Sequence, residues 1–127
     1  MQTETSLNLQ QWAGRLATAI PIVIMTLSAS LKIVQPTGAA ETFAKAGYDS
    51  TQMTGIAILE LICTAIYLVP RTSVLGAVLL TGYLGGAIAA HVRIRDAFLG
   101  PLLLGVLVWV GLWLRDPRIR AFLRTRS

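Results

Sequence analysis

The sequence predicts an all-α integral membrane protein, a bundle of four transmembrane helices that forms one domain over residues 1–127. The first observation is composition: 54% of the residues are hydrophobic and 13% are charged, whereas a soluble domain has about 25% charged residues. The second is patterning, because the apolar residues gather in four stretches, 16–34, 53–69, 74–92 and 97–114. Each has about 17 to 19 residues, enough to cross a hydrocarbon core of about 30 Å. Backbone groups in lipid must bond to one another, so we expect these spans to be α-helices.

The basic residues are divided unequally between the two ends of the predicted bundle. Seven of the 11 Lys and Arg residues fall at one end: Arg15, Arg71, Arg115, Arg118, Arg120, Arg124 and Arg126. The other four are Lys32, Lys45, Arg93 and Arg95. Because cytoplasmic segments carry an excess of Lys and Arg, we expect both termini to be cytoplasmic. The net charge of +5 then reflects membrane topology, and its expected partner is the lipid bilayer and not nucleic acid.

The first stretch, 16–34, contains Pro21 and has Lys32 near its outer end. Proline inside a helix produces a kink or marks a first turn. Ser28 and Lys32 are four residues apart and share a helix face. Two positions for the Lys32 side chain remain open: it reaches the lipid headgroups, or it turns inward to meet Glu60.

The connection after the first span is predicted to contain a short helix. Pro36 and Gly38 end the first span, and Gly47 ends a helical piece over about 39–46. This piece mixes Phe43 with charged residues, which is typical of a helix that lies in the membrane interface. We expect it to cover the extracytoplasmic mouth of the bundle, as a lid or as a connector.

Glu60 is the most informative residue of the second stretch, 53–69, because this stretch holds no other charge. A carboxylate in hydrocarbon costs several kcal/mol unless it is protonated, paired or hydrated, so Glu60 marks a functional site by default. The same stretch contains Cys63, the chain's single cysteine. One thiol cannot form an internal disulfide or a dithiol redox pair, and we expect Cys63 to be a small packing residue.

The third stretch contains a pattern of small residues at every fourth position, Gly82, Gly86 and Ala90. This pattern is typical of membrane helices that approach closely, either within the chain or in a homo-oligomer. His91 follows at the outer end of the stretch. Since the sequence has no second histidine, we do not predict a metal site there.

A polar pocket is predicted where the first three spans meet. With alternating helix directions, Lys32, Glu60, His91 and Arg93 all fall in the extracytoplasmic half of the bundle at similar depth. We therefore expect a pocket there, closed by the segment 36–47. The fourth stretch is uniformly apolar apart from glycines and tryptophans, and we expect it to supply packing and interfacial anchoring.

Several blocks of the sequence have the order and spacing of a known family. They are Ser28 with Lys32, FAKAGY (43–48), ILELICTAIYLVPRT (58–72), GYLGGAIAAHVR (82–93) and GLWLRDPRIR (111–120). With these blocks the chain resembles the DoxX-like family of small bacterial four-helix membrane proteins. The resemblance implies a multi-pass protein of the bacterial inner (plasma) membrane. It also implies a ligand-binding site at Lys32, Glu60, Tyr67, Tyr83, His91 and Arg93.

The resemblance and the residues together leave several functions open. Some members of the family are described as partners of membrane oxidoreductases, so one hypothesis is a pocket that binds a small lipophilic ligand such as a quinone in such a system. The chain has no set of haem or iron–sulfur ligands, so electrons would come from a partner protein. No catalytic residue is assigned, and quinone is the cofactor candidate.

The other hypotheses assign different roles to the same side chains. In a non-catalytic assembly or scaffold protein, a Lys32–Glu60–His91 network would fix helix register without chemistry. A proton-coupled small-molecule transporter would use Glu60 as its membrane carboxylate. A membrane enzyme would use Glu60 and His91 as acid and base.

Overall fold

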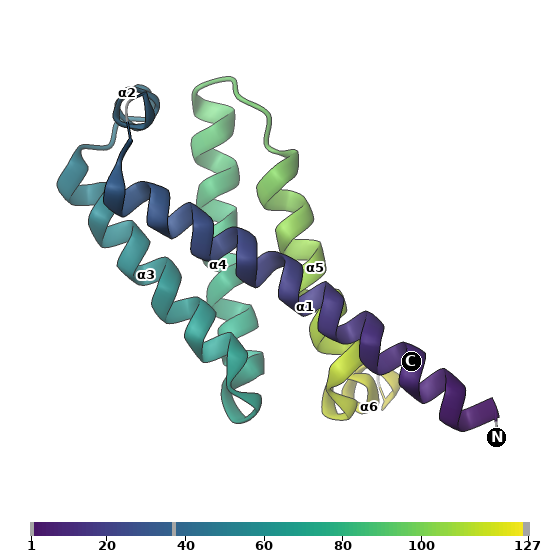
Figure 1. Cartoon of the computed structure of the whole chain (residues 1–127). Helices are drawn as coiled ribbons and strands as arrows, with labels where there is room; N and C mark the ends of the chain where they lie inside the picture. The colour runs from purple at the N-terminus through teal and green to yellow at the C-terminus, as the bar shows by residue number, and fades with distance from the viewer. Residues whose placement is uncertain (1, 37, 126–127) are drawn as a thin grey trace.

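The computed structural model describes residues 2–36 and 38–125, and these residues form helices and short connections (Figure 1). In chain order they are α1 (Gln2–Val34), α2 (Ala39–Lys45), α3 (Ser50–Leu68), the 3₁₀ turn η1 (Pro70–Thr72), α4 (Ser73–Arg93), α5 (Leu99–Arg115) and α6 (Pro117–Thr125). No strand occurs within the described ranges, which confirms the all-α prediction. Three of the helices, α1, α3 and α4, are long and apolar enough to cross a membrane, and α5 is apolar but shorter, at 17 residues.

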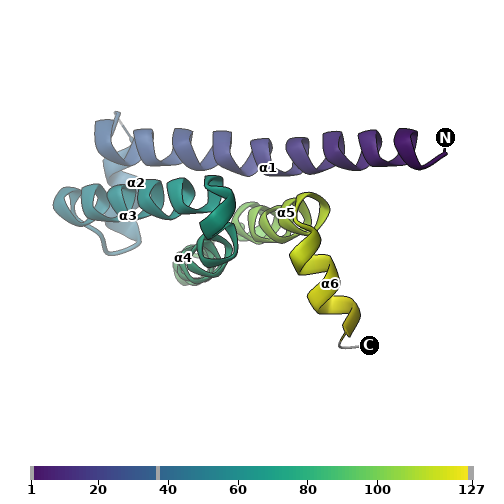
Figure 2. The ribbon, with the colours of Figure 1, turned by 90° about the horizontal axis from the view of Figure 1, so that it is seen from below.

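The helices differ from the predicted stretches mainly at their ends. Helix α1 begins at Gln2, well before residue 16, because the polar residues that precede the apolar stretch continue the same helix. It also continues through the buried Pro21, and Figure 2 shows it as one unbroken helix. Helix α6 lies outside every predicted stretch. Asp116 caps its start by accepting a hydrogen bond from the backbone N–H of Arg118 at 2.9 Å, and Pro117 is its first residue.

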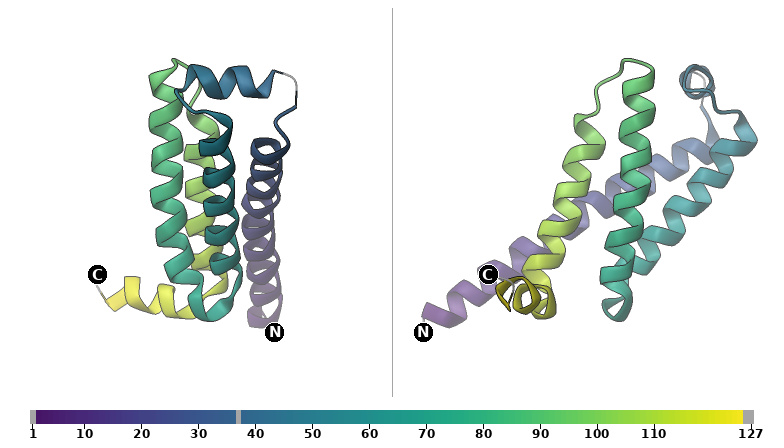
Figure 3. Two further views of the ribbon diagram at one scale, coloured as in Figure 1. Left: turned by 90° about the vertical axis from the view of Figure 1, so that its left-hand side faces the viewer. Right: turned by 180° about the vertical axis from the view of Figure 1, so that it is seen from behind.

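The four long helices form a closed ring. Helix α1 packs against α3 and α5, and α4 packs against the same two helices from the other side (Figure 2). Helices α2 and α6 run across opposite ends of this bundle (Figure 3). The predicted short helix is therefore present as Ala39–Lys45, and its location in a membrane interface stays a prediction.

At the α6 end of the bundle, glycines allow close contact between helices. A Cβ on Gly76 of α4 would overlap the backbone of Tyr67 in α3, and a Cβ on Gly111 of α5 would lie 2.7 Å from Thr18 Oγ1 of α1. The core here contains Met25, Cys63, Tyr67, Ala77, Leu80, Leu84, Val108 and Leu112. Cys63 is buried among these side chains, in the packing role that the sequence predicts.

Substitution of Gly76 tests this close contact. Gly76→Ala forces α3 and α4 apart, and we expect it to lower the free energy of unfolding by about 1–3 kcal/mol or more. Gly85→Ala on the same helix is the matched control, because a Cβ there meets no described atom within 4 Å. Thermal unfolding in detergent measures both variants. Equal melting temperatures for the two would contradict the packing described here.

The junction between α5 and α6 is expected to make stability depend on acid pH. The side chain of Arg118 donates to Asp116 at 3.1 Å and 2.9 Å, and these bonds hold the pKa of Asp116 below its usual value. Because the pKa is lower in the folded state, the stabilisation is fully present above the unfolded-state pKa of about 3.9 and is lost as the pH falls through the folded-state value.

Asp116→Asn isolates this charge effect, since Asn also caps helices well. We expect the variant to be less stable than the wild type at neutral pH and to lose less stability on acidification. Melting curves recorded from pH 7 down to about pH 3 measure the difference. Parallel pH profiles for the two proteins would refute the assignment.

Candidate functional site

The candidate site is a cluster of polar side chains contributed by α1, α3 and α4. The Lys32 ammonium donates hydrogen bonds to Ser28 Oγ at 2.7 Å, Glu60 Oε2 at 2.7 Å and the Tyr83 hydroxyl at 2.8 Å. Tyr83 in turn donates its hydroxyl proton to the same Glu60 Oε2, at 2.9 Å. Lys32 therefore turns inward to meet Glu60, the second of the two positions that the sequence leaves open.

Each member of this cluster is positioned by its helix. Ser28 lies one turn before Lys32 on α1, so both side chains meet on one face. Glu60 is in the middle of α3 and is 1% exposed, while the Lys32 side chain is 14% exposed. Charges this deeply buried are costly to desolvate, and their mutual attraction together with the hydroxyl groups around them offsets that cost.

A cavity of about 550 Å³ lies beside the cluster. It is lined by α1, α2, α3, α4 and α5, and most of its wall is apolar. On one side Ile24 and Met25 of α1 face it, and Leu104 of α5 contributes another part of the wall. Phe43 of α2 and Ala46, the residue that directly follows this helix, also line it. The volume lies within the range of about 300–1,000 Å³ that is typical of small-molecule sites.

The predicted small-residue pattern on α4 lines this cavity. A Cβ on Gly82 or on Gly86 would meet no described atom within 4 Å, and Gly82, Gly86 and Ala90 all border the cavity. Of the two uses that the sequence leaves open, a close helix contact within the chain is therefore not made at Gly82 or Gly86. The close approach of α4 to α3 occurs instead at Gly76, nearer the turn that joins the two helices. Use of the pattern in a homo-oligomer stays a prediction.

His91 lines the cavity and is not hydrogen-bonded to the charged pair. Its Nδ1 lies 2.6 Å from the backbone oxygen of Ala87, one turn earlier on α4. The third member of the network with Lys32 and Glu60 is Tyr83, and so the network predicted with His91 in that place is wrong in this detail. Tyr83 and His91 are eight residues apart, which puts them on similar faces of α4 but about 12 Å apart along its axis.

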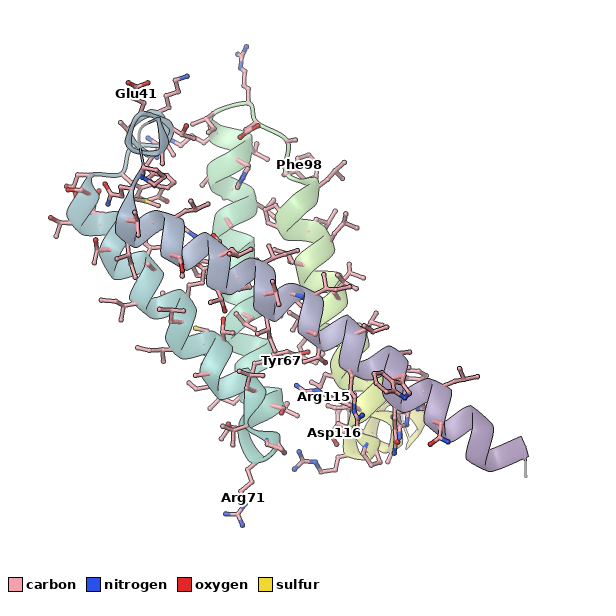
Figure 4. The ribbon with its side chains drawn as sticks, in the orientation of Figure 1. Glu41, Tyr67, Arg71, Phe98, Arg115 and Asp116 are labelled. Carbon is pink, nitrogen blue, oxygen red and sulfur yellow. The ribbon has the colours of Figure 1, made fainter. Side chains whose placement is uncertain are left out.

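The structure places two of the predicted site residues away from the cavity wall. Tyr67 is buried toward the opposite end of α3, where its hydroxyl donates to the backbone oxygen of Val108 at 2.6 Å. The Arg115 guanidinium lies 4.6 Å from the centre of the Tyr67 ring, and Figure 4 shows these two side chains at the α6 end of the bundle. Arg93 is exposed. Its guanidinium lies next to Gly47, in the connection between α2 and α3, at 3.9 Å from a Cβ built on that glycine.

Lys32, Glu60, Tyr83 and His91 do line the cavity. Sequence reasoning placed Ser28 on the face of Lys32 but did not include it in the site. It also missed Tyr48, which lines the cavity from the connection between α2 and α3. The position of Tyr48 directly after Gly47, the glycine that ends the short helix, was the sequence feature that could have placed this aromatic side chain near the cavity.

Comparison with protein families finds a match to the DoxX-like family over residues 16–113. This range includes every residue of the hydrogen-bonded cluster and the cavity wall around it. Comparison with curated proteins and with solved structures finds no match. The family match covers most of the sequence and agrees with the apolar helices of the bundle. The chain belongs to the DoxX-like family and is a small membrane protein.

Proposed function

We propose that this DoxX-like protein binds a small lipophilic ligand, such as a quinone, in the cavity beside Lys32, Glu60 and Tyr83. The observation that carries the proposal is an apolar-walled cavity of about 550 Å³ that has a buried ion pair and a phenol in its wall. Sites for small molecules combine apolar walls with a few oriented polar groups in this way. A lipophilic ligand would also reach such a cavity from the surrounding membrane.

The chemistry of the lining residues suits a ligand that carries oxygen atoms. A phenol and an imidazole form hydrogen bonds with hydroxyl and carbonyl groups, whereas a carboxylate accepts a hydrogen bond from a hydroxyl group. All three also support local proton transfer. Any electrons that the ligand carries would come from or go to a partner protein, because the sequence offers no set of haem or iron–sulfur ligands. We therefore propose that the protein acts as the partner of a membrane oxidoreductase system.

One observation favours the second candidate function, a non-catalytic assembly or scaffold protein. The Lys32 ammonium has three N–H groups, and all three are donated within the protein, to groups on α1, α3 and α4. A network that joins three helices in this way can fix their register and rotation without any ligand.

The two candidates are distinguished by variants of the ion pair. Glu60→Gln leaves the Lys32 charge without its partner, and we expect it to cost about 3–5 kcal/mol of stability. The double variant Lys32→Met/Glu60→Gln removes both charges and is expected to regain most of this stability. If the cavity is a ligand site, the stable double variant binds a decyl-substituted quinone, in the redox form that the wild type binds more tightly, at least about tenfold more weakly than the wild type does.

Calorimetric titration and thermal unfolding in detergent measure binding and stability on the same samples. Glu41→Gln is the matched control, because Glu41 is exposed on α2 and points away from the bundle (Figure 4). Unchanged binding in the double variant would exclude the proposed site. Absence of binding to the wild type would favour the scaffold function.

We also propose that the protein lies in the bacterial inner membrane with both termini in the cytoplasm, as the distribution of Lys and Arg favours. Arg71, in the turn between α3 and α4, projects from the end of the bundle near α6 (Figure 4). Arg95, in the connection between α4 and α5, belongs to the other end.

Cysteine labelling tests this orientation. In a Cys63→Ala background, we expect a membrane-impermeant maleimide added to intact spheroplasts to label Arg95→Cys. Arg71→Cys should react only after the membrane is permeabilised. The reverse pattern would place the termini outside.

A further inference from the structure

Within the charged cluster, most hydrogen-bond donors already have a partner in the protein, whereas one acceptor has none among the described residues. All three N–H donors of Lys32 are occupied, and the hydroxyl proton of Tyr83 is donated to Glu60. The hydroxyl of Ser28 accepts one bond from Lys32 and keeps its own rotatable proton. At this end of the cavity, the fixed side-chain donors of the cluster are therefore already used within the protein.

The unused capacity lies on the carboxylate of Glu60. Its Oε2 accepts both the bond from Lys32 and the bond from Tyr83, whereas its Oε1 accepts none from the described residues. As a member of an ion pair, a carboxylate accepts hydrogen bonds and has none to donate. Glu60 lines the cavity, so the group that remains for a ligand here is a charged acceptor.

His91 offers the same kind of group further along the wall. The carbonyl oxygen of Ala87 has no proton to give, so the 2.6 Å contact requires the proton to be on His91 Nδ1. In the neutral ring Nε2 is then an acceptor. Glu60 on α3 and the neutral form of His91 on α4 thus each leave an acceptor for a ligand.

We propose that the cavity selects lipophilic ligands that donate a hydrogen bond to Glu60, namely hydroxylated aromatic molecules such as the hydroquinone form of a quinone. This inference rests on the proposed ligand-binding function and specifies the ligand class. A hydroxyl group gives Oε1 a charge-assisted hydrogen bond. A carbonyl group has no proton for Oε1, and the side-chain donors left to it near the cluster are the hydroxyls of Ser28 and Tyr48. It would displace water from a carboxylate oxygen without replacing the hydrogen bond, which is costly.

Three probes of matched shape test this selection: a decyl-substituted hydroquinone, the corresponding benzoquinone and the dimethyl ether of the hydroquinone. We expect the hydroquinone to bind at least about tenfold more tightly than either of the others, the value of about one hydrogen bond to a charged group. Calorimetric titration under anaerobic conditions measures each affinity. The buffer is reducing for the hydroquinone and non-reducing for the benzoquinone. If the benzoquinone or the ether binds as tightly as the hydroquinone, the inference is wrong and the proposed ligand site stands. If none of the three binds, both are overturned.

The double variant Lys32→Met/Glu60→Gln assigns the selection to the carboxylate. The glutamine amide both donates and accepts, so we expect the preference for the hydroquinone over the benzoquinone to disappear in this variant. Glu41→Gln should keep the wild-type preference. A preference that survives in the double variant would overturn the assignment to Glu60.

Discussion

The Lys32–Glu60 ion pair, together with Tyr83, is the interaction on which the cavity half of the bundle depends. It joins α1, α3 and α4 in a region where α4 keeps open space beside Gly82 and Gly86. Neither charge is stable alone at this depth, because removal of one partner from a buried pair costs about 3–5 kcal/mol. The requirement that both charges stay paired therefore holds three helices in position around a space that their side chains do not fill.

The other half of the bundle is stabilised by close packing of its helices. Gly76 and Gly111 bring helix backbones into direct contact, and the buried Tyr67 bonds through its hydroxyl to Val108. The same residue type thus has opposite uses on α4: Gly76 closes the distance to α3, whereas Gly82 and Gly86 leave room for the cavity. Met25 and Leu84 belong both to the core and to the cavity wall, so the packed half of the bundle closes one end of the cavity.

Hydropathy and the cost of buried charge were enough to predict the four long helices, a membrane protein and the importance of Glu60, and they left open whether Lys32 meets Glu60 or reaches the lipid headgroups. Both rules concern how deep a residue lies. They say little about the rotation of each helix about its axis, which depends on packing. For this reason the sequence could not decide whether the small-residue pattern makes a contact within the chain, and Gly82 and Gly86 make none with a described residue. Tyr83 and His91 share a face of α4, so the sequence could not decide which of them reaches the ion pair. Tyr67 shares a stripe with Glu60 but lies about two turns away, at a depth where it packs.

The structural role of Glu60 and the ligand-binding role proposed for it fall on different oxygens of one carboxylate. Oε1 is not among the buried side-chain atoms of the described residues that lack a partner, and Glu60 lines the cavity, so water can reach this oxygen. Thr64, one turn further along α3, has the hydroxyl that is nearest in sequence, yet it donates to the backbone oxygen of Glu60 at 2.8 Å and not to the carboxylate. Oε2 accounts for the joining of three helices, and Oε1 accepts no bond from the described residues. A ligand hydroxyl in the cavity would replace that water with a charge-assisted hydrogen bond, which is the role that the proposed ligand-binding function assigns to Oε1.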